Sequence, residues 1–277
     1  MCLCKKSKNI NKNYNLFESE LKMSETLVLT RKDYVVRTVI RVIAIVCSVY
    51  GMAMSWDSMA LTYFTNLSNL MICVALLGSL ILDTRSALKS KSDEQGEQAE
   101  RTGSWVDSKP NAWYIFKFMM TISIAVTFTL YLCFLAPTNK LGFVGAYMNN
   151  GCSSLCVHFI TPLLAIFDFI LFDYKYKSSR AHVYFATIPP LAYVAYAVAL
   201  SEFAGVRWGE HAMAAPYNFL NYKAPAGWFG FAPNTFNSTT LGVGVVYLLA
   251  IFTLIFIGIG IAFLAIKNAR ATTCLRA

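Results

Sequence analysis

The stretch TYFTNLSNLM, residues 62–71, opens a long apolar run and yet carries five Ser, Thr and Asn side chains. About 20 apolar residues in a row can cross a bilayer as a helix. Of the 277 residues, 56% are hydrophobic and 14% are charged, whereas a soluble domain carries about 25% charged residues. The sequence therefore predicts an all-α, polytopic membrane protein, and the polar start of this run needs an explanation of its own.

Six apolar runs are long enough to span a membrane. We predict a bundle of six transmembrane helices at residues 35–55, 64–82, 113–136, 152–172, 183–203 and 243–266. They divide the chain into a basic tail over 1–34, a membrane domain over 35–268 and a short tail over 269–277. The first 34 residues have no apolar core, so they resemble a cytoplasmic tail more than a signal peptide.

The basic residues outside the spans are distributed very unevenly. The tails and loops on one side of the predicted membrane hold eighteen Lys and Arg residues, and the loops on the other side hold three. Positive charge accumulates on the cytoplasmic side, so both termini should be cytoplasmic, and 56–63, 137–151 and 204–242 should face outward. We expect an integral protein of the plasma membrane. A nucleic-acid partner is not expected, because no soluble fold concentrates the basic residues.

Two of the predicted loops differ in character. Residues 83–112 are polar and of mixed charge, which indicates a flexible cytoplasmic loop. Residues 204–242 are rich in aromatic side chains and in Gly and Pro turns, which favours an ordered, non-helical cover at the outer interface. We expect this outer loop to act as a lid, with Trp228 and Phe229 as its main contacts.

Three basic residues lie inside the predicted spans, near their cytoplasmic ends: Arg37, Arg41 and Lys117. Long basic side chains at such positions usually extend their charged ends toward the interface. We therefore expect all three to snorkel.

The polar residues of the second span form a stripe. Thr62, Thr65, Asn66 and Asn69 follow the spacing i, i+3, i+4, i+7 and share one helix face. Such a stripe faces other helices or a wet cavity rather than lipid. One interpretation is that these groups join helices through hydrogen bonds, and the other is that they line a functional site.

The fourth span contains His158, while the other two histidines fall in predicted loops. A histidine within a span is costly without partners and is a functional candidate, although a structural histidine bonded across helices is the alternative. Ser154, His158 and Thr161 share one face. The second and fourth spans run in the same direction, so Thr65 and His158 should lie at similar depth, near the outer end.

A hydroxyl and an imidazole at the same depth suit nucleophilic catalysis. Thr65 is the predicted nucleophile and His158 the predicted general base. Asn66 and Asn69 are candidates to donate hydrogen bonds to an oxyanion. Three further side chains are expected to line the pocket: Thr62, Ser154 and Thr161.

The same sequence offers little for other chemistry. Asp57 and Glu202 are the outer-side carboxylates that could orient the imidazole.

A metal site is disfavoured. Cys152 and Cys156 share a helix face, but His158 points well away from Cys156 at about 100° per residue. We expect no metal and no cofactor.

Four motifs occur in order along the spans: FTNLSN in the second, HFITPLLAIFDFILFD in the fourth, PPLAY in the fifth and PYNFLN before the sixth. Together they resemble the androgen-induced and androgen-dependent membrane protein family, and still more its bacterial relatives. The likeness runs from about residue 35 to 268, outside the cytoplasmic loop. It implies a six-span fold and intramembrane hydrolysis of fatty acid esters of hydroxy fatty acids, with a Thr matching Thr65 and a His matching His158.

The leading hypothesis is therefore an intramembrane lipid-ester hydrolase, whose partners are membrane lipids or an acyl-ester substrate. The alternative is a non-enzymatic multi-pass protein, such as a small transporter or an assembly factor. In that case the polar stripe would line a path or bind a partner. Loss of one hydroxyl discriminates the two, because a catalyst needs both Thr65 and His158.

Overall fold

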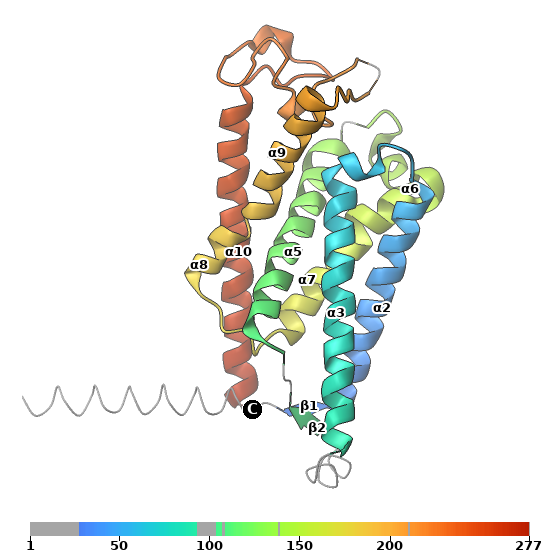
Figure 1. Cartoon of the computed structure of the whole chain (residues 1–277), viewed down its shortest axis with the longest axis vertical. Helices are drawn as coiled ribbons and strands as arrows, with labels where there is room; N and C mark the ends of the chain where they lie inside the picture. The colour runs from blue at the N-terminus through green and yellow to red at the C-terminus, as the bar shows by residue number, and fades with distance from the viewer. Residues whose placement is uncertain (1–27, 93–103, 107–108, 138, 210, 277) are drawn as a thin grey trace, which may run out of the picture.

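Six segments in the described part of the chain are long and apolar enough to span a membrane (Figure 1). The computed structural model describes residues 28–92, 104–106, 109–137, 139–209 and 211–276. Three spans are single helices: α2 (Arg31–Met54), α3 (Phe64–Ser92) and α10 (Val245–Arg276). The predicted all-α fold with six membrane-spanning segments is confirmed.

The other three spans are composite. In chain order their segments are α5 (Asn111–Leu130) with η2 (Tyr131–Leu135), α6 (Gly142–Leu155) with η3 (Cys156–Ile160) and α7 (Thr161–Phe172), and α8 (Arg180–Phe185) with α9 (Ile188–Phe203). The segments η2 and η3 are π-helical turns. Turns of this kind inside α-helices occur frequently at functional sites.

The fourth span differs from its prediction at its start. Residues 137–151 were expected to be a loop, but helix begins again at Gly142. The helix then breaks at residues 149–152, where Asn150 has φ 46° and Gly151 has φ 63°. Asn and Gly tolerate this left-handed region better than other residues. Helix therefore precedes the predicted start of the fourth span at residue 152, and that predicted start coincides with the break.

The predicted flexible loop over 83–112 is partly structured. Helix α3 continues past 82 to Ser92, while residues 93–103 and 107–108 lie outside the described part of the chain. The strand β2 (Ser104–Val106) pairs antiparallel with β1 (Val28–Thr30), with Val28 opposite Val106. This short ribbon joins the start of α2 to the connection between α3 and α5.

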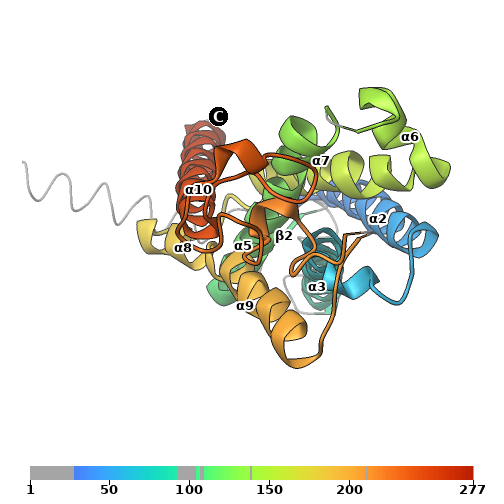
Figure 2. The same cartoon turned by 90° about the horizontal axis from the view of Figure 1, so that it is seen from above.

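The two ends of the bundle are distinct. In Figure 1 the β1–β2 ribbon and the end of α10 lie at the bottom, and the 204–242 loop lies at the top. Seen from above, this loop crosses the ends of α9 and α10 and extends over α5 (Figure 2). The connections at 56–63 and around 137–151 lie at the same end as the 204–242 loop, because successive spans alternate in direction (Figure 1).

Seven charged side chains, each at most 9% exposed, form an ionic cluster near the bottom of the bundle. Its members are Arg37, Arg41, Asp83, Lys109, Lys117, Asp168 and Asp173. Arg41 donates to Asp168 at 2.8 Å and to Asp83 at 2.6 Å. Lys117 pairs with Asp168 and lies 2.6 Å from Asp173. The cluster joins α2, α3, α5 and α7 through charge-assisted hydrogen bonds.

The prediction that Arg37, Arg41 and Lys117 snorkel is wrong. Each is no more than 1% exposed, because carboxylates from neighbouring helices hold the cations inside the bundle. Arg37 also donates to the backbone carbonyl of Phe172 at 3.0 Å. Buried charges persist only when they are paired in this way.

Candidate functional site

Two cavities meet toward the end of the bundle that carries the 204–242 loop, and Thr65 and His158 line both. The apolar cavity has a volume of about 60 Å³ and is walled by Phe64, Val126, Leu130, Tyr193, Leu249 and Phe256. The polar cavity has a volume of about 350 Å³ and includes Ser55, Asp57, Asn66, Asn150, Ser153 and Ser154. Thr65 and His158 thus stand at the boundary between an apolar space and a polar one.

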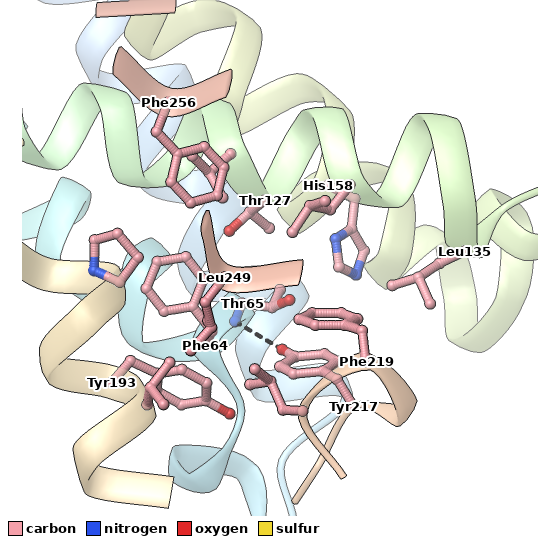
Figure 3. Close-up of a pocket in the computed structure, with 15 residues that line it drawn as sticks. Phe64, Thr65, Thr127, Leu135, His158, Tyr193, Tyr217, Phe219, Leu249 and Phe256 are labelled. Carbon is pink, nitrogen blue, oxygen red and sulfur yellow. Dashed lines mark hydrogen bonds between the residues drawn. The ribbon is translucent and has the colours of Figure 1, made fainter. Parts of the chain in front are cut away.

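Figure 3 shows how the two side chains meet. Thr65 comes from the first turn of α3 and His158 from η3, and both project into the same space. The structure brings together the two residues that the sequence placed at equal depth in different spans.

The turn that carries His158 is shaped by the proline that follows it. Pro162 has no N–H to donate to the carbonyl of His158, four residues before it. The preceding residue, Thr161, donates instead to Cys156, five residues back. This pattern defines the π-helical turn, and it widens the helix where His158 faces the cavities.

Tyr131 lies in the other π-helical turn, η2. This turn arises in the same way as η3. Ala136 donates to the carbonyl of Tyr131 at 2.8 Å, and the next residue is Pro137. The Tyr131 ring stacks on His158 with centroids 3.6 Å apart and ring planes 11° apart. Its hydroxyl donates to the carbonyl of Ala146 at 2.7 Å. The His158 imidazole therefore stacks on a ring that is held at one end by the backbone of η2 and at the other by the hydrogen bond of its hydroxyl.

The His158 Nδ1 atom is buried and has no hydrogen-bond partner among the described residues. Buried polar atoms are usually paired, so an unpaired one in a cavity wall needs an explanation. A neutral imidazole has one nitrogen that accepts a proton. His158 thus has the unused polar capacity that a general base requires.

The two carboxylates considered for orienting the imidazole have other partners. Asp57 lines the polar cavity and accepts a hydrogen bond from the backbone of Met59 at 2.8 Å. Glu202 accepts from the Tyr222 hydroxyl at 2.5 Å and pairs with Lys223 at 2.7 Å. In the described ranges the contact that fixes the imidazole is the aromatic stack on Tyr131, not a carboxylate.

Thr65 is held by its backbone at the start of α3. Tyr63 is extended, with φ −95° and ψ 134°, and the helix begins at Phe64. The Thr65 N–H donates to the hydroxyl of Tyr217 at 3.4 Å, and the Thr65 carbonyl accepts from the amide of Asn69 at 2.9 Å. These contacts place the Thr65 side chain beside the Tyr217 hydroxyl, with which it also interacts.

The two asparagines of the polar stripe lie in different places. Asn66 lines the polar cavity and donates to the carbonyl of Ala60 at 2.8 Å. Asn69 is fully buried and lines neither cavity. Its amide donates to Thr65 and, at 3.1 Å, to the carbonyl of Val157. Asn69 therefore joins α3 to η3 in the manner of an interhelical polar contact.

The other three residues that were predicted to line the pocket also lie in different places. Ser154 lines the polar cavity. Thr62 accepts a hydrogen bond from the Trp208 indole at 2.8 Å, and Thr161 donates to the carbonyl of Ala44 at 3.3 Å. Neither Thr62 nor Thr161 lines the two cavities, so their hydroxyls hold the outer loop and α2 in place.

The outer loop contributes different residues from those expected of a lid. Trp228 stacks on Tyr222 with centroids 4.9 Å apart, and Phe229 is 68% exposed. Neither lines the two cavities, whereas Tyr217 lines both and Phe219 lines the apolar one. Sequence reasoning overlooked Tyr217, although the alternation of aromatic and polar residues in PYNFLN was the available signal.

Within the described residues, no group of three His, Cys, Asp or Glu side chains could hold a metal ion. Comparison with known proteins gives no match, whether with family models, with curated proteins or with solved structures. The two cavities and the residues at their boundary are therefore the features that indicate a function.

Proposed function

We propose that the protein is an intramembrane lipid-ester hydrolase in which Thr65 is the nucleophile and His158 the general base. The observation that carries the proposal is that these two residues, from different helices, line the same two cavities, with the Nδ1 of His158 unpaired. A hydroxyl and a neutral imidazole facing one space are the minimum for acyl transfer.

The shapes of the cavities support an acyl-ester substrate. The apolar cavity, at about 60 Å³, holds only the first carbons of an acyl chain next to the ester, and the rest of the ester and a water molecule fit the polar one. A groove of about 260 Å³ between α3, α5 and α9 shares Phe64 and Tyr193 with the apolar cavity. It offers a route for a chain that approaches from the bilayer. Esters of hydroxy fatty acids are the specific substrates that the resemblance to the androgen-induced family suggests.

The reaction follows ordinary acyl transfer. His158 accepts the proton of Thr65 as the hydroxyl oxygen attacks the acyl carbon, and it returns that proton to the departing alcohol. Water then attacks the acyl-threonine, gives a proton to His158 and releases the fatty acid. The second proton returns to Thr65, so the enzyme is regenerated and the products are one acid and one alcohol.

We place the protein in the plasma membrane with both termini in the cytoplasm. The support is the concentration of eighteen Lys and Arg residues on one side of the spans against three on the other. The catalytic pair then lies in the outer half of the bilayer, below the 204–242 loop.

The test is labelling of the purified protein with a fluorophosphonate, followed by mapping of the modified residue. Thr65 should be labelled in the wild type, and Thr65→Ala and His158→Ala should abolish labelling. Thr129→Ala and His211→Ala are matched controls, because Thr129 lies on α5 outside both cavities and His211 is exposed in the outer loop. Label that remains in His158→Ala would remove the proposed base.

A transporter is the second candidate function, and the observation that favours it is the buried ionic cluster. Ionisable groups inside membrane proteins often mark ion or proton pathways. Substrate-dependent proton movement in vesicles, lost in Asp168→Asn and unchanged in Thr65→Ala, would favour this candidate over the hydrolase.

A further inference from the structure

A hydrolase of this kind needs a donor for the negative charge that develops on the acyl oxygen, and the predicted donors are engaged elsewhere. Asn69 uses its amide on two backbone carbonyls, those of Thr65 and Val157. Asn66 donates to Ala60. Asn66 keeps a second amide N–H but lines only the polar cavity, so a donor that reaches both cavities is sought among the other polar groups at their boundary.

Four tyrosines line the two cavities: Tyr63 and Tyr131 line the polar one, Tyr193 lines the apolar one and Tyr217 lines both. Tyr131 donates to the carbonyl of Ala146, and Tyr193 donates to the carbonyl of Thr62 at 2.8 Å. The Tyr217 oxygen accepts hydrogen bonds from Thr65, through the backbone N–H at 3.4 Å and through the Thr65 side chain. The proton of Tyr217 therefore remains available to a group in the cavities.

The position of Tyr217 suits this role. It lines both cavities, as Thr65 and His158 do, and Figure 3 shows its hydroxyl directed toward Thr65. The ring stacks on Phe219 with centroids 5.2 Å apart and an interplanar angle of 9°. A donor fixed in this way needs no reorganisation when charge develops.

Tyr217 also keeps its proton under ordinary conditions. Burial raises the pKa of the Tyr217 phenol above its usual value of about 10. The phenol is therefore neutral at physiological pH, which a hydrogen-bond donor to an oxyanion requires.

We propose that Tyr217, supplied by the outer loop, is a further catalytic residue that donates a hydrogen bond to the oxyanion formed when Thr65 attacks the ester. This inference rests on the proposed hydrolase function. As the Thr65 oxygen bonds to the acyl carbon, the carbonyl π electrons move to oxygen, and the Tyr217 O–H stabilises that charge. When the bond to the alcohol breaks, the carbonyl re-forms and Tyr217 keeps its proton.

The experiment compares wild type, Tyr217→Phe and Tyr222→Phe, using a p-nitrophenyl ester of a medium-chain acid in detergent micelles. Tyr222 is the matched control, because it lies in the same loop and its hydroxyl bonds to Glu202 outside both cavities. Tyr217→Phe should lower kcat about 100-fold or more with little change in KM, as loss of an oxyanion donor does. Tyr222→Phe should retain wild-type kcat.

Two further measurements separate catalysis from folding. The thermal midpoint of Tyr217→Phe should match that of the wild type, because the ring and its stack on Phe219 remain. A trifluoromethyl ketone, which forms a tetrahedral adduct with a hydroxyl nucleophile, should bind Tyr217→Phe more weakly by a similar factor. The product carboxylate, which forms no adduct, should bind both proteins equally.

The possible failures are distinguishable. An active wild type with an equally active Tyr217→Phe overturns this inference and leaves Thr65 and His158 in place. A raised KM with unchanged kcat also overturns it, because that result indicates ground-state binding alone. A wild type that neither hydrolyses esters nor is labelled at Thr65 overturns the proposed function, and the inference with it.

Discussion

His158 and Tyr131 stack with their ring centroids 3.6 Å apart, and each lies in a π-helical turn that ends two residues before a proline. Prolines at 137 and 162 force both backbones away from the regular α-helical pattern. The two π-helical turns, η2 and η3, lie side by side, and the imidazole of His158 faces the cavities. In the proposed hydrolase, an aromatic ring contacts His158 where many hydrolases use a carboxylate to hold the catalytic histidine.

Removing this ring should weaken catalysis without unfolding the protein. An aromatic stack contributes about 0.5–1.5 kcal/mol, so Tyr131→Leu should lower kcat by up to about tenfold through a less well-oriented His158. Tyr131→Phe keeps the ring and loses the hydroxyl that bonds to Ala146 and interacts with Ser154, so it should retain most activity. Ester hydrolysis and thermal midpoints of both variants check this, and equal rates for wild type and Tyr131→Leu would contradict it.

The catalytic pair should behave as one unit. Thr65→Ala and His158→Ala should each reduce ester hydrolysis to background, and the double variant should be no worse than either single one, because both remove the same step. Thr65→Ser keeps a hydroxyl and should retain measurable activity. Steady-state kinetics on these four variants, with fluorophosphonate labelling as a second readout, measure whether the two losses are additive. Additive losses would count against joint action.

The sequence predicted the spans and the depth of the two candidate residues, because both depend on local patterns. Apolar run length sets the number of spans, and the shared direction of spans two and four places Thr65 near His158. The ionic cluster was missed, since which carboxylate meets Arg41 depends on the rotation of α2, α3 and α7. Tyr217 was missed for a similar reason, because a loop residue reaches the site only through tertiary folding.

The apolar cavity should set the acyl-chain length that the protein accepts. Leu249 of α10 lines this cavity and does not line the polar one. Leu249→Trp adds bulk inside it and should lower kcat/KM for long-chain esters about tenfold or more, while acetyl esters are hydrolysed at near the wild-type rate. Exposed Leu254→Trp on the same helix is the control. Equal loss for short and long chains would contradict a cavity that holds the acyl chain.

The lid residues should affect turnover through the loop rather than by direct contact. The Trp228→Ala/Phe229→Ala double variant should alter hydrolysis of lipid esters while leaving expression intact. Trp228→Ala should carry the effect, because it removes the stack on Tyr222, and exposed Phe229→Ala alone should be close to wild type. Kinetics of the three variants are the measurement, and an unchanged double variant would exclude a role for these side chains.

The ionic cluster should contribute to stability and not to chemistry, because it lines neither of the two cavities at the site. Asp168→Asn removes one of the two carboxylates that pair with each of Arg41 and Lys117 and leaves more positive charge buried, and breaking a buried pair typically costs about 3–5 kcal/mol. Glu202→Gln is the matched contrast, because its pair with Lys223 has side chains 39% and 48% exposed, and exposed pairs contribute about 0–1 kcal/mol. Thermal unfolding in micelles should therefore show a clearly lower midpoint for Asp168→Asn and almost no change for Glu202→Gln.

Adding Lys117→Met to Asp168→Asn should restore part of the loss, since it removes one of the uncompensated charges. A midpoint for Asp168→Asn equal to that of the wild type would mean that these charges do not hold the four helices together.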